Sequence, residues 1–163
     1  MAAALLRLLS AGVPVTIAAA AAAAGMPRAR AEPVLRSWPA VFWDDRGRVT
    51  GMSGLALAEM PHRIRRAGIG LHAWCAWDPL FLARVIGDLQ VATADPVTGE
   101  AITYRADGDG AITGASHPGS VLSFLRPGRP WGDDVMTTSA ITCCTSPARP
   151  PRSGGPPLTP APS

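Results

Sequence analysis

One short segment concentrates the residue types of this chain that could do chemistry. Cys75 and Asp78 lie three residues apart in the run LHAWCAWDPLFL, which spans residues 71–82. Pro79 and the apolar pattern after it predict a helix that begins near Cys75 or Asp78 and ends at Gly87. A cysteine at a helix N-terminus favours the thiolate, and a carboxyl three residues on would lie beside the sulfur and share a proton with it. The segment therefore offers a nucleophile and a proton donor within one turn.

The same residues also have a purely structural interpretation. Cys75 would be a small buried hydrophobe and Asp78 a helix cap ahead of Pro79, because most buried cysteines are inert. Trp74 and Trp77 are expected first of all in the core, and only secondarily as walls that keep water from a reactive thiolate. The residue types alone leave both interpretations open.

Composition limits the class of protein that could carry such a site. The 163 residues are enough for one domain or two small ones, and 47% apolar against 17% charged residues allow a buried core. All 15 basic residues are arginines and they are scattered, which argues against a nucleic-acid partner. The three cysteines, Cys75, Cys143 and Cys144, are too few for a disulfide framework and indicate a reducing compartment, the cytoplasm. The apolar runs are interrupted, so we expect no transmembrane helix.

The first thirty residues can be interpreted in two ways. An apolar stretch followed by Ala29-Arg30-Ala31 resembles a secretory signal with its cleavage site. Pro14 and the polar side chains near it stand where a signal would be most apolar, which favours three short helices over 2–10, 16–24 and 27–37. Thr16 can cap the second helix, Gly25 can end it, and Pro27 suits a first helical turn.

A turn cluster over 44–47 then separates strand-like runs at 41–43 and 48–50. Three helices followed by a hairpin are the plan of a winged helix-turn-helix. The helix that would enter a DNA groove offers only Arg28, Arg30 and Arg36, so we interpret the unit as a packing module. The fold class is therefore α+β: a winged module over 1–60, a small mixed sheet with packed helices over 61–145, and a Pro-rich disordered tail over 146–163.

The centre of the chain supplies the strands of that second unit. Leu55 and Leu57 alternate as in a strand, and 90–93 pairs with 101–104 around a turn at Thr98-Gly99, with a further strand at 121–125. The basic patch of residues 62–66 is interpreted as a solvated strand or loop in preference to an anion site. The turn at 107–110 lacks the acidic residue that a calcium loop needs. The three histidines, His62, His72 and His117, are expected to be structural, although His72 could border the active site because it is close to Cys75 in the sequence.

The segment around Cys75 resembles the core signature of the alkylmercury lyase (organomercurial lyase) family. The likeness includes HAWCAWDPLFL, Ile86-Gly87 and the Pro96-Val97-Thr98-Gly99 turn, and it extends upstream through LLRLLSAGVPVTIAAAAAAAG, Val41-Phe42-Trp43, Gly54-Leu55 and Pro61-His62-Arg63. It covers roughly residues 5–127, which argues against removal of the N-terminus.

The resemblance implies a cytosolic enzyme of mercury resistance that breaks carbon–mercury bonds and releases a hydrocarbon and mercuric ion. Family members use two cysteines and an aspartate, of which the first cysteine and the aspartate fall on Cys75 and Asp78. Soft thiolates suit mercury, and Asp78 would take up a thiol proton and pass it to the departing carbon. No cofactor is expected, because the metal enters with the substrate. The implied partners are the organomercurial, free thiols and a mercuric reductase that receives Hg(II).

The chain departs from the family pattern in two places. A structural cysteine is often found before the Thr-Gly turn, where this chain has Ala92-Thr93-Ala94-Asp95. The second catalytic cysteine should follow a stretch like 131–135, and the candidates are Cys143 and Cys144, or Ser139 in another alignment. Cys143 would share the substrate mercury with Cys75. We hypothesise that the C-terminal strand and helix have been replaced, by truncation or a shifted reading frame.

Two functions from other classes remain as alternatives to the lyase. A missing second ligand could leave a noncatalytic thiol protein that binds mercury or another soft metal. The winged module could instead make the chain a DNA-binding metal sensor, whose binding would be sensitive to salt.

Overall fold

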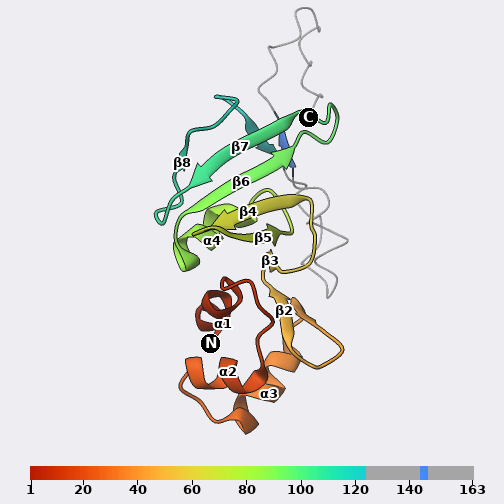
Figure 1. Cartoon of the computed structure of the whole chain (residues 1–163), viewed down its shortest axis with the longest axis vertical. Helices are drawn as coiled ribbons and strands as arrows, with labels where there is room; N and C mark the ends of the chain where they lie inside the picture. The colour runs from red at the N-terminus through yellow and green to blue at the C-terminus, as the bar shows by residue number, and fades with distance from the viewer. Residues whose placement is uncertain (124–143, 147–163) are drawn as a thin grey trace, which may run out of the picture.

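The computed structural model describes residues 1–123 and 144–146, which form four helices and ten strands (Figure 1). The helices are α1 (Ala2–Leu9), α2 (Ile17–Ala23), α3 (Arg28–Ser37) and α4 (Asp78–Ile86). The strands are β1 (Val41–Trp43), β2 (Val49–Met52), β3 (Leu55–Ala56), β4 (His62–Arg66), β5 (Ile69–Ala73), β6 (Leu89–Ala94), β7 (Ala101–Ala106), β8 (Ile112–Thr113), β9 (Val121–Ser123) and β10 (Cys144–Ser146).

The three N-terminal helices follow local signals in the sequence, and their predicted bounds are confirmed to within about one residue. The Thr16 hydroxyl accepts a 3.1 Å hydrogen bond from the Ala19 amide, so it caps α2 as predicted. Gly25 follows α2 with a left-handed backbone, at φ +64°. Pro27 is the N-cap of α3, one residue before the predicted position, and Ala31 and Leu35 form the buried face of that helix.

The β1–β2 hairpin is confirmed, and its turn is held by one carboxylate. Oδ1 of Asp44 accepts hydrogen bonds from the amides of Arg46 and Arg48 at 3.0 and 2.8 Å, and Oδ2 pairs with the Arg48 guanidinium at 2.7 Å. These bonds stabilise the turn, because an aspartate at the first position of a turn can accept hydrogen bonds from the amides that follow it. They also lower the pKa of Asp44, and the hydrogen bond from the Arg48 amide is the largest cause.

Eight strands form one sheet, in the order β1-β2-β3-β5-β4-β6-β7-β8, and every hydrogen-bonded pair in it is antiparallel. The prediction of a mixed sheet is therefore wrong for this part of the chain. The connection from β5 through α4 does lead to a strand that runs in the same direction, β6. Because β4 lies between β5 and β6, these parallel strands share no hydrogen bonds. The two remaining strands, β9 and β10, form a separate antiparallel pair.

One face of the sheet holds the core and the other faces outward. Alternate residues of β6 and β7 are buried, among them Val91 and Ile102, and α4 contributes Leu82 and Ile86 to the same core. In Figure 1 the helices α1–α3 lie together at the end of the molecule that holds β2, while α4 contacts β6 and β7 of the sheet. Within residues 1–123 and 144–146, no helix has the length and apolar character required to cross a bilayer.

The basic patch of residues 62–66 divides between the two faces because it forms strand β4. Arg63 and Arg65 are exposed, which agrees with the prediction of a solvated strand. His62 is buried instead, and its Nδ1 lies 2.8 Å from the hydroxyl of Thr93 on β6. Arg66 donates a hydrogen bond to the carbonyl of Ile86 at the end of α4.

Candidate active site

The segment that carries Cys75 is a turn between β5 and α4. The preceding strand ends at Ala73, which pairs with Leu55 on one side and with His62 on the other. Helix α4 begins at Asp78, the later of the two predicted starts, and the Asp78 amide donates a 3.2 Å hydrogen bond to the Cys75 carbonyl. Cys75 therefore lies just before the helix, on a turn that is anchored by a sheet strand at its start.

Cys75 and Asp78 are in direct contact. The Cys75 backbone N–H donates a 2.7 Å hydrogen bond to Oδ2 of Asp78, and the Cys75 side chain also hydrogen bonds to this carboxyl group. Burial raises the pKa of Asp78 above its usual value of 3.8, against the opposing effect of hydrogen bonds from Cys75 and from the Trp74 backbone. A carboxyl in this setting holds its proton to higher pH, beside a thiol that can bind a soft metal.

An apolar cluster lies on one side of the turn. Trp74 is 5% exposed, and its ring lies 4.8 Å from that of Phe42, measured between centroids. Ala56 is buried with Trp74, and the partly buried Met60 and Cys75 pack against them, as does Ala40. The prediction of a core position is confirmed for Trp74. Cys75 thus has apolar side chains on one side and the Asp78 carboxyl on another.

Trp77 is 50% exposed, so the prediction that it lies in the core is wrong. The buried residues of α4 are Pro79, Leu82, Ala83 and Ile86, which form one stripe along the helix. Trp77 precedes this stripe by two residues with a helical backbone, which turns its side chain about 200° away from Pro79. The tryptophan therefore points away from the face that packs on the sheet.

Two further residues hold the turn, and sequence reasoning assigned neither a role there. The Trp74 amide donates a 3.0 Å hydrogen bond to the carbonyl of Gly54, in the turn between β2 and β3. The hydroxyl of Tyr104, on β7, donates to the carbonyl of Ala76 at 3.4 Å. Both contacts join residues far apart in the chain, so local patterns carry no signal for them. The resemblance includes the pair Gly54-Leu55, but it gives this glycine no role.

The histidines make contacts that fit a structural role. Nδ1 of His72 lies 3.1 Å from the Met60 amide and 3.2 Å from its carbonyl oxygen, which ties the β3–β4 loop to β5. His117 lies 2.8 Å from the Glu100 carboxylate. The Asp107 carboxylate accepts hydrogen bonds from the amides of Asp109 and Ala111, so it closes its own turn. Among the residues that the structure describes, no three or more histidine, cysteine, aspartate or glutamate side chains are grouped to hold a metal ion.

The candidates for a second thiolate fall largely outside the described residues. Cys143 and Ser139 lie outside them, as do the stretch 131–135 and the tail after residue 146. Cys144 is the first residue of β10, and its backbone pairs with Ser123 of β9. The predicted strand at 121–125 is observed as β9 over its first three residues, and 124–125 lie beyond the described part.

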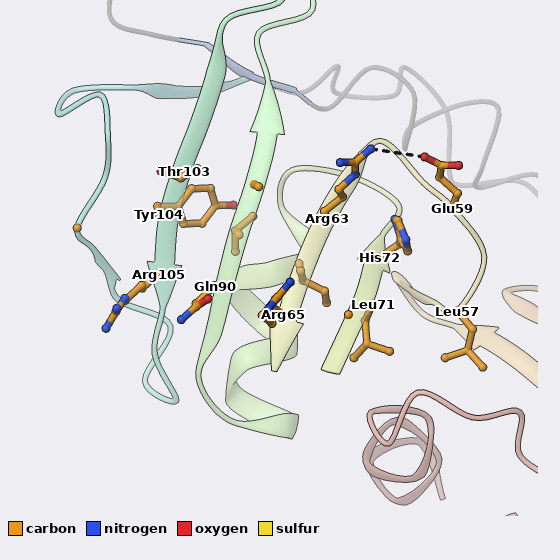
Figure 2. Close-up of a pocket in the computed structure, with 15 residues that line it drawn as sticks. Leu57, Glu59, Arg63, Arg65, Leu71, His72, Gln90, Thr103, Tyr104 and Arg105 are labelled. Carbon is orange, nitrogen blue, oxygen red and sulfur yellow. Dashed lines mark ion pairs between the residues drawn. The ribbon is translucent and has the colours of Figure 1, made fainter. Parts of the chain in front are cut away.

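A groove on the outer face of the sheet is separate from the Cys75 turn (Figure 2). It has a volume of about 840 Å³, and Arg65, Gln90 and Arg105 are neighbours across three strands that line it. Arg63, also in the groove, lies 3.6 Å from the Glu59 carboxylate, and both side chains are largely exposed. The described residues that line the groove include no cysteine, and α4 packs on the opposite face of the sheet.

Comparison with known proteins links this geometry to one family. The family model described as alkylmercury lyase (MerB) matches residues 55–147. An alkylmercury lyase of Staphylococcus epidermidis is 36% identical over 140 residues, which cover 85% of this chain and 62% of that protein. An alkylmercury lyase of Pseudomonas putida is 38% identical over 124 residues, covering 76% and 58%. The chain thus spans about three fifths of the length of these curated relatives.

A solved structure shares the fold. The crystal structure of the mercury-bound form of MerB2 superposes with a TM-score of 0.66 at 15% sequence identity, and the match covers 88% of this chain and 72% of that one. At this identity the likeness concerns the fold alone.

Proposed function

The chain belongs to the alkylmercury lyase family, and on that premise we propose that it cleaves the carbon–mercury bond of organomercurials by protonolysis, releasing a hydrocarbon and Hg(II). The observation that carries this proposal is the contact between Cys75 and the Asp78 carboxyl. This contact brings a sulfur ligand for mercury and a carboxyl group that can take up and return a proton to one turn. Because the chain spans only part of its relatives, their whole activity is transferred to it as a proposal.

Each of the two residues has a distinct role in the proposed reaction. The Cys75 thiol loses its proton to Asp78 as its sulfur bonds to the mercury of the substrate, R–Hg⁺. Asp78 then donates this proton to the carbon of R as the carbon–mercury bond breaks, so that R–H leaves and Hg(II) stays on the sulfur. The raised pKa of Asp78 supports the step, because the carboxyl must hold its proton until the carbon accepts it.

A second thiolate completes the proposal. Cys143 or Cys144 would add a sulfur ligand to the mercury, and the charge that it donates would make the carbon more basic. No cofactor is needed in this scheme, since the metal is part of the substrate. Free thiols would then remove the mercuric ion and pass it to a mercuric reductase. We place the reaction in the cytoplasm, where thiols remain reduced.

We propose that the N-terminal unit over 1–60, with its three helices and a hairpin, is a winged-helix-like module with a packing role. Glu32 lies between two of the arginines that a DNA-binding helix would use, 3.7 Å from Arg28 and 3.1 Å from Arg36. Arg36 also stacks on the ring of Trp43, at 5.0 Å from its centroid. These contacts within the unit support a role in packing against the catalytic unit, 61–145, rather than in binding phosphates. The Pro-rich segment 146–163 is given no role.

The reaction is tested by supplying phenylmercury with excess free thiol and measuring benzene by gas chromatography. The wild-type chain is expected to release benzene, and Cys75→Ser and Asp78→Ala are each expected to abolish the release. Thr98→Ala, in an exposed turn, is the control and should retain the wild-type rate. Benzene release that survives Cys75→Ser would contradict the proposed mechanism.

The same protein distinguishes the alternative functions. Mercury that binds with a stoichiometry of one, without benzene, would identify a noncatalytic soft-metal binding protein. Binding to a defined DNA duplex that weakens steeply with salt would identify a metal sensor. Either outcome replaces the lyase proposal.

A further inference from the structure

We propose that Gly54 is a positioning residue of the Cys75–Asp78 site: the absence of a side chain at Gly54 leaves the space that the Asp78 carboxyl occupies. The inference rests on the proposed lyase function for its kinetic consequence. Its structural part, the dependence of the Asp78 carboxyl on Gly54, can be measured without any lyase activity.

Gly54 reaches the site through the pairing of strands. It ends the two-residue turn between β2 and β3, and Leu55, the next residue, pairs with Ala73 at the end of β5. The two chain segments therefore lie side by side where β5 leads into the Cys75 turn. The Gly54 carbonyl accepts the 3.0 Å hydrogen bond from the Trp74 amide, one residue before Cys75.

The carboxyl of Asp78 fills the place that a side chain at position 54 would take. A Cβ atom built on Gly54 would lie 2.5 Å from Cγ, 2.7 Å from Oδ1 and 2.9 Å from Cβ of Asp78. All three distances are far shorter than a van der Waals contact, so any larger residue must displace the carboxyl or move the turn. Asp78 is on the first turn of α4 and its short side chain has little freedom to swing away.

Gly54 therefore contacts residues that precede and follow Cys75. Its carbonyl accepts the hydrogen bond from Trp74, and its lack of a side chain leaves room for the Asp78 carboxyl, which accepts a hydrogen bond from the Cys75 amide. A displaced Asp78 would lose its 2.7 Å contact with the Cys75 amide.

The chain contains a matched control for the backbone requirement of this turn. Ser53 and Gly54 have φ of +44° and +88°, and Ala67 and Gly68, between β4 and β5, have φ of +46° and +86°. Both glycines occupy the left-handed region, so alanine is strained equally at either position. A Cβ atom on Gly68 meets nothing within 4 Å. Comparison of the two substitutions isolates the contact with Asp78 from the cost of the backbone.

The experiment compares Gly54→Ala with Gly68→Ala in the full chain. The contact is measured by hydrogen–deuterium exchange of the Cys75 backbone amide, which donates to Asp78, and benzene release from phenylmercury is measured as kcat and KM. We expect Gly54→Ala to speed the exchange of this amide and to lower kcat on the order of 100-fold with a smaller change in KM. Gly68→Ala should leave both close to the wild type. Equal effects of the two substitutions on the exchange would overturn the proposal.

A double variant covers the case in which Gly54→Ala does not fold. Asp78→Ala removes the Cγ and Oδ1 atoms that lie closest to the added Cβ atom. In the Asp78→Ala background, Gly54→Ala is therefore expected to fold, and its unfolding midpoint should approach that of Gly68→Ala in the same background. Failure of this double variant to fold, when Gly68→Ala folds in the same background, would overturn the proposal. If the wild type lacks lyase activity, and Gly54→Ala still speeds exchange of the Cys75 amide while Gly68→Ala does not, the proposed function is refuted and the role of Gly54 stands.

Discussion

The Cys75 backbone N–H donates a 2.7 Å hydrogen bond to Oδ2 of Asp78, three residues along the chain. This bond holds the partly buried carboxyl beside the residue whose sulfur is proposed to bind mercury. The consequences of such an arrangement can be measured by the pH dependence of stability and by substitution of the residues around it.

Replacement of Asp78 by asparagine is expected to change stability in a pH-dependent way. A carboxyl whose pKa is raised on folding stabilises the fold fully below its unfolded pKa, near 3.8, and this contribution is lost as the pH rises through the folded pKa. Asp78→Asn removes the titration. The free energy of unfolding of the variant, relative to the wild type, should therefore increase between pH 3 and pH 7. Urea unfolding across this range measures it, and a constant difference would contradict the raised pKa.

The Asp44→Asn variant should show the opposite dependence. Hydrogen bonds from Arg46 and Arg48 lower the pKa of Asp44, so its contribution is present above the unfolded pKa of 3.8 and is lost as the pH falls through the folded pKa. The deficit in stability of the variant should be largest at neutral pH and should disappear in acid. The two aspartate variants thus control for each other in one series of urea titrations.

Serine substitution at Cys143 and at Cys144 separately identifies the second thiolate. Substitution of the cysteine that supplies the second ligand should lower benzene release toward the level of Cys75→Ser, because mercury bound by a single sulfur leaves the carbon less basic. The other position should retain the wild-type rate. Mercury titration in the presence of a competing thiol gives the matching loss of affinity. Wild-type rates in both single variants and in the double variant would exclude the pair.

Leu55→Ala should destabilise the whole chain. Leu55 is fully buried in β3, between the strands of the N-terminal hairpin and β5. Loss of its side chain from a packed core costs about 2–5 kcal/mol. Ile112→Ala is the control, because Ile112 is 47% exposed and its truncation should change stability by less than about 0.5 kcal/mol. The comparison is made by urea unfolding, and similar losses in the two variants would show that β3 is not part of the cooperative core.

Features of the fold that depend on neighbouring residues were predictable from the sequence. Thr16 as a helix cap, the left-handed Gly25 and the turn begun by Asp44 all act within four residues of their partners. The same holds for the Cys75 and Asp78 contact, since a spacing of three residues places both groups on one turn. These contacts could be predicted because they follow from the side-chain types of residues that are close together in the sequence.

Features that depend on strand pairing were not predictable in the same way. Nothing near β5 in the sequence indicates that β4 separates it from β6, so the sheet was expected to be mixed. The core position predicted for Trp77 failed because hydrophobicity alone does not reveal which side of α4 meets the sheet. The role of Gly54 could not be predicted for a third reason. A glycine can indicate that another group approaches the backbone closely, but the sequence does not show which group that is.

Because β3 pairs with β5, the Cys75 turn depends on a second segment of the chain for its structure. The β2–β3 hairpin lies about twenty residues earlier in the chain. Its Gly54 provides both the carbonyl that accepts from Trp74 and the space that the Asp78 carboxyl occupies. An attempt to graft the run around Cys75 onto another scaffold would therefore have to carry the β2–β3 hairpin with it.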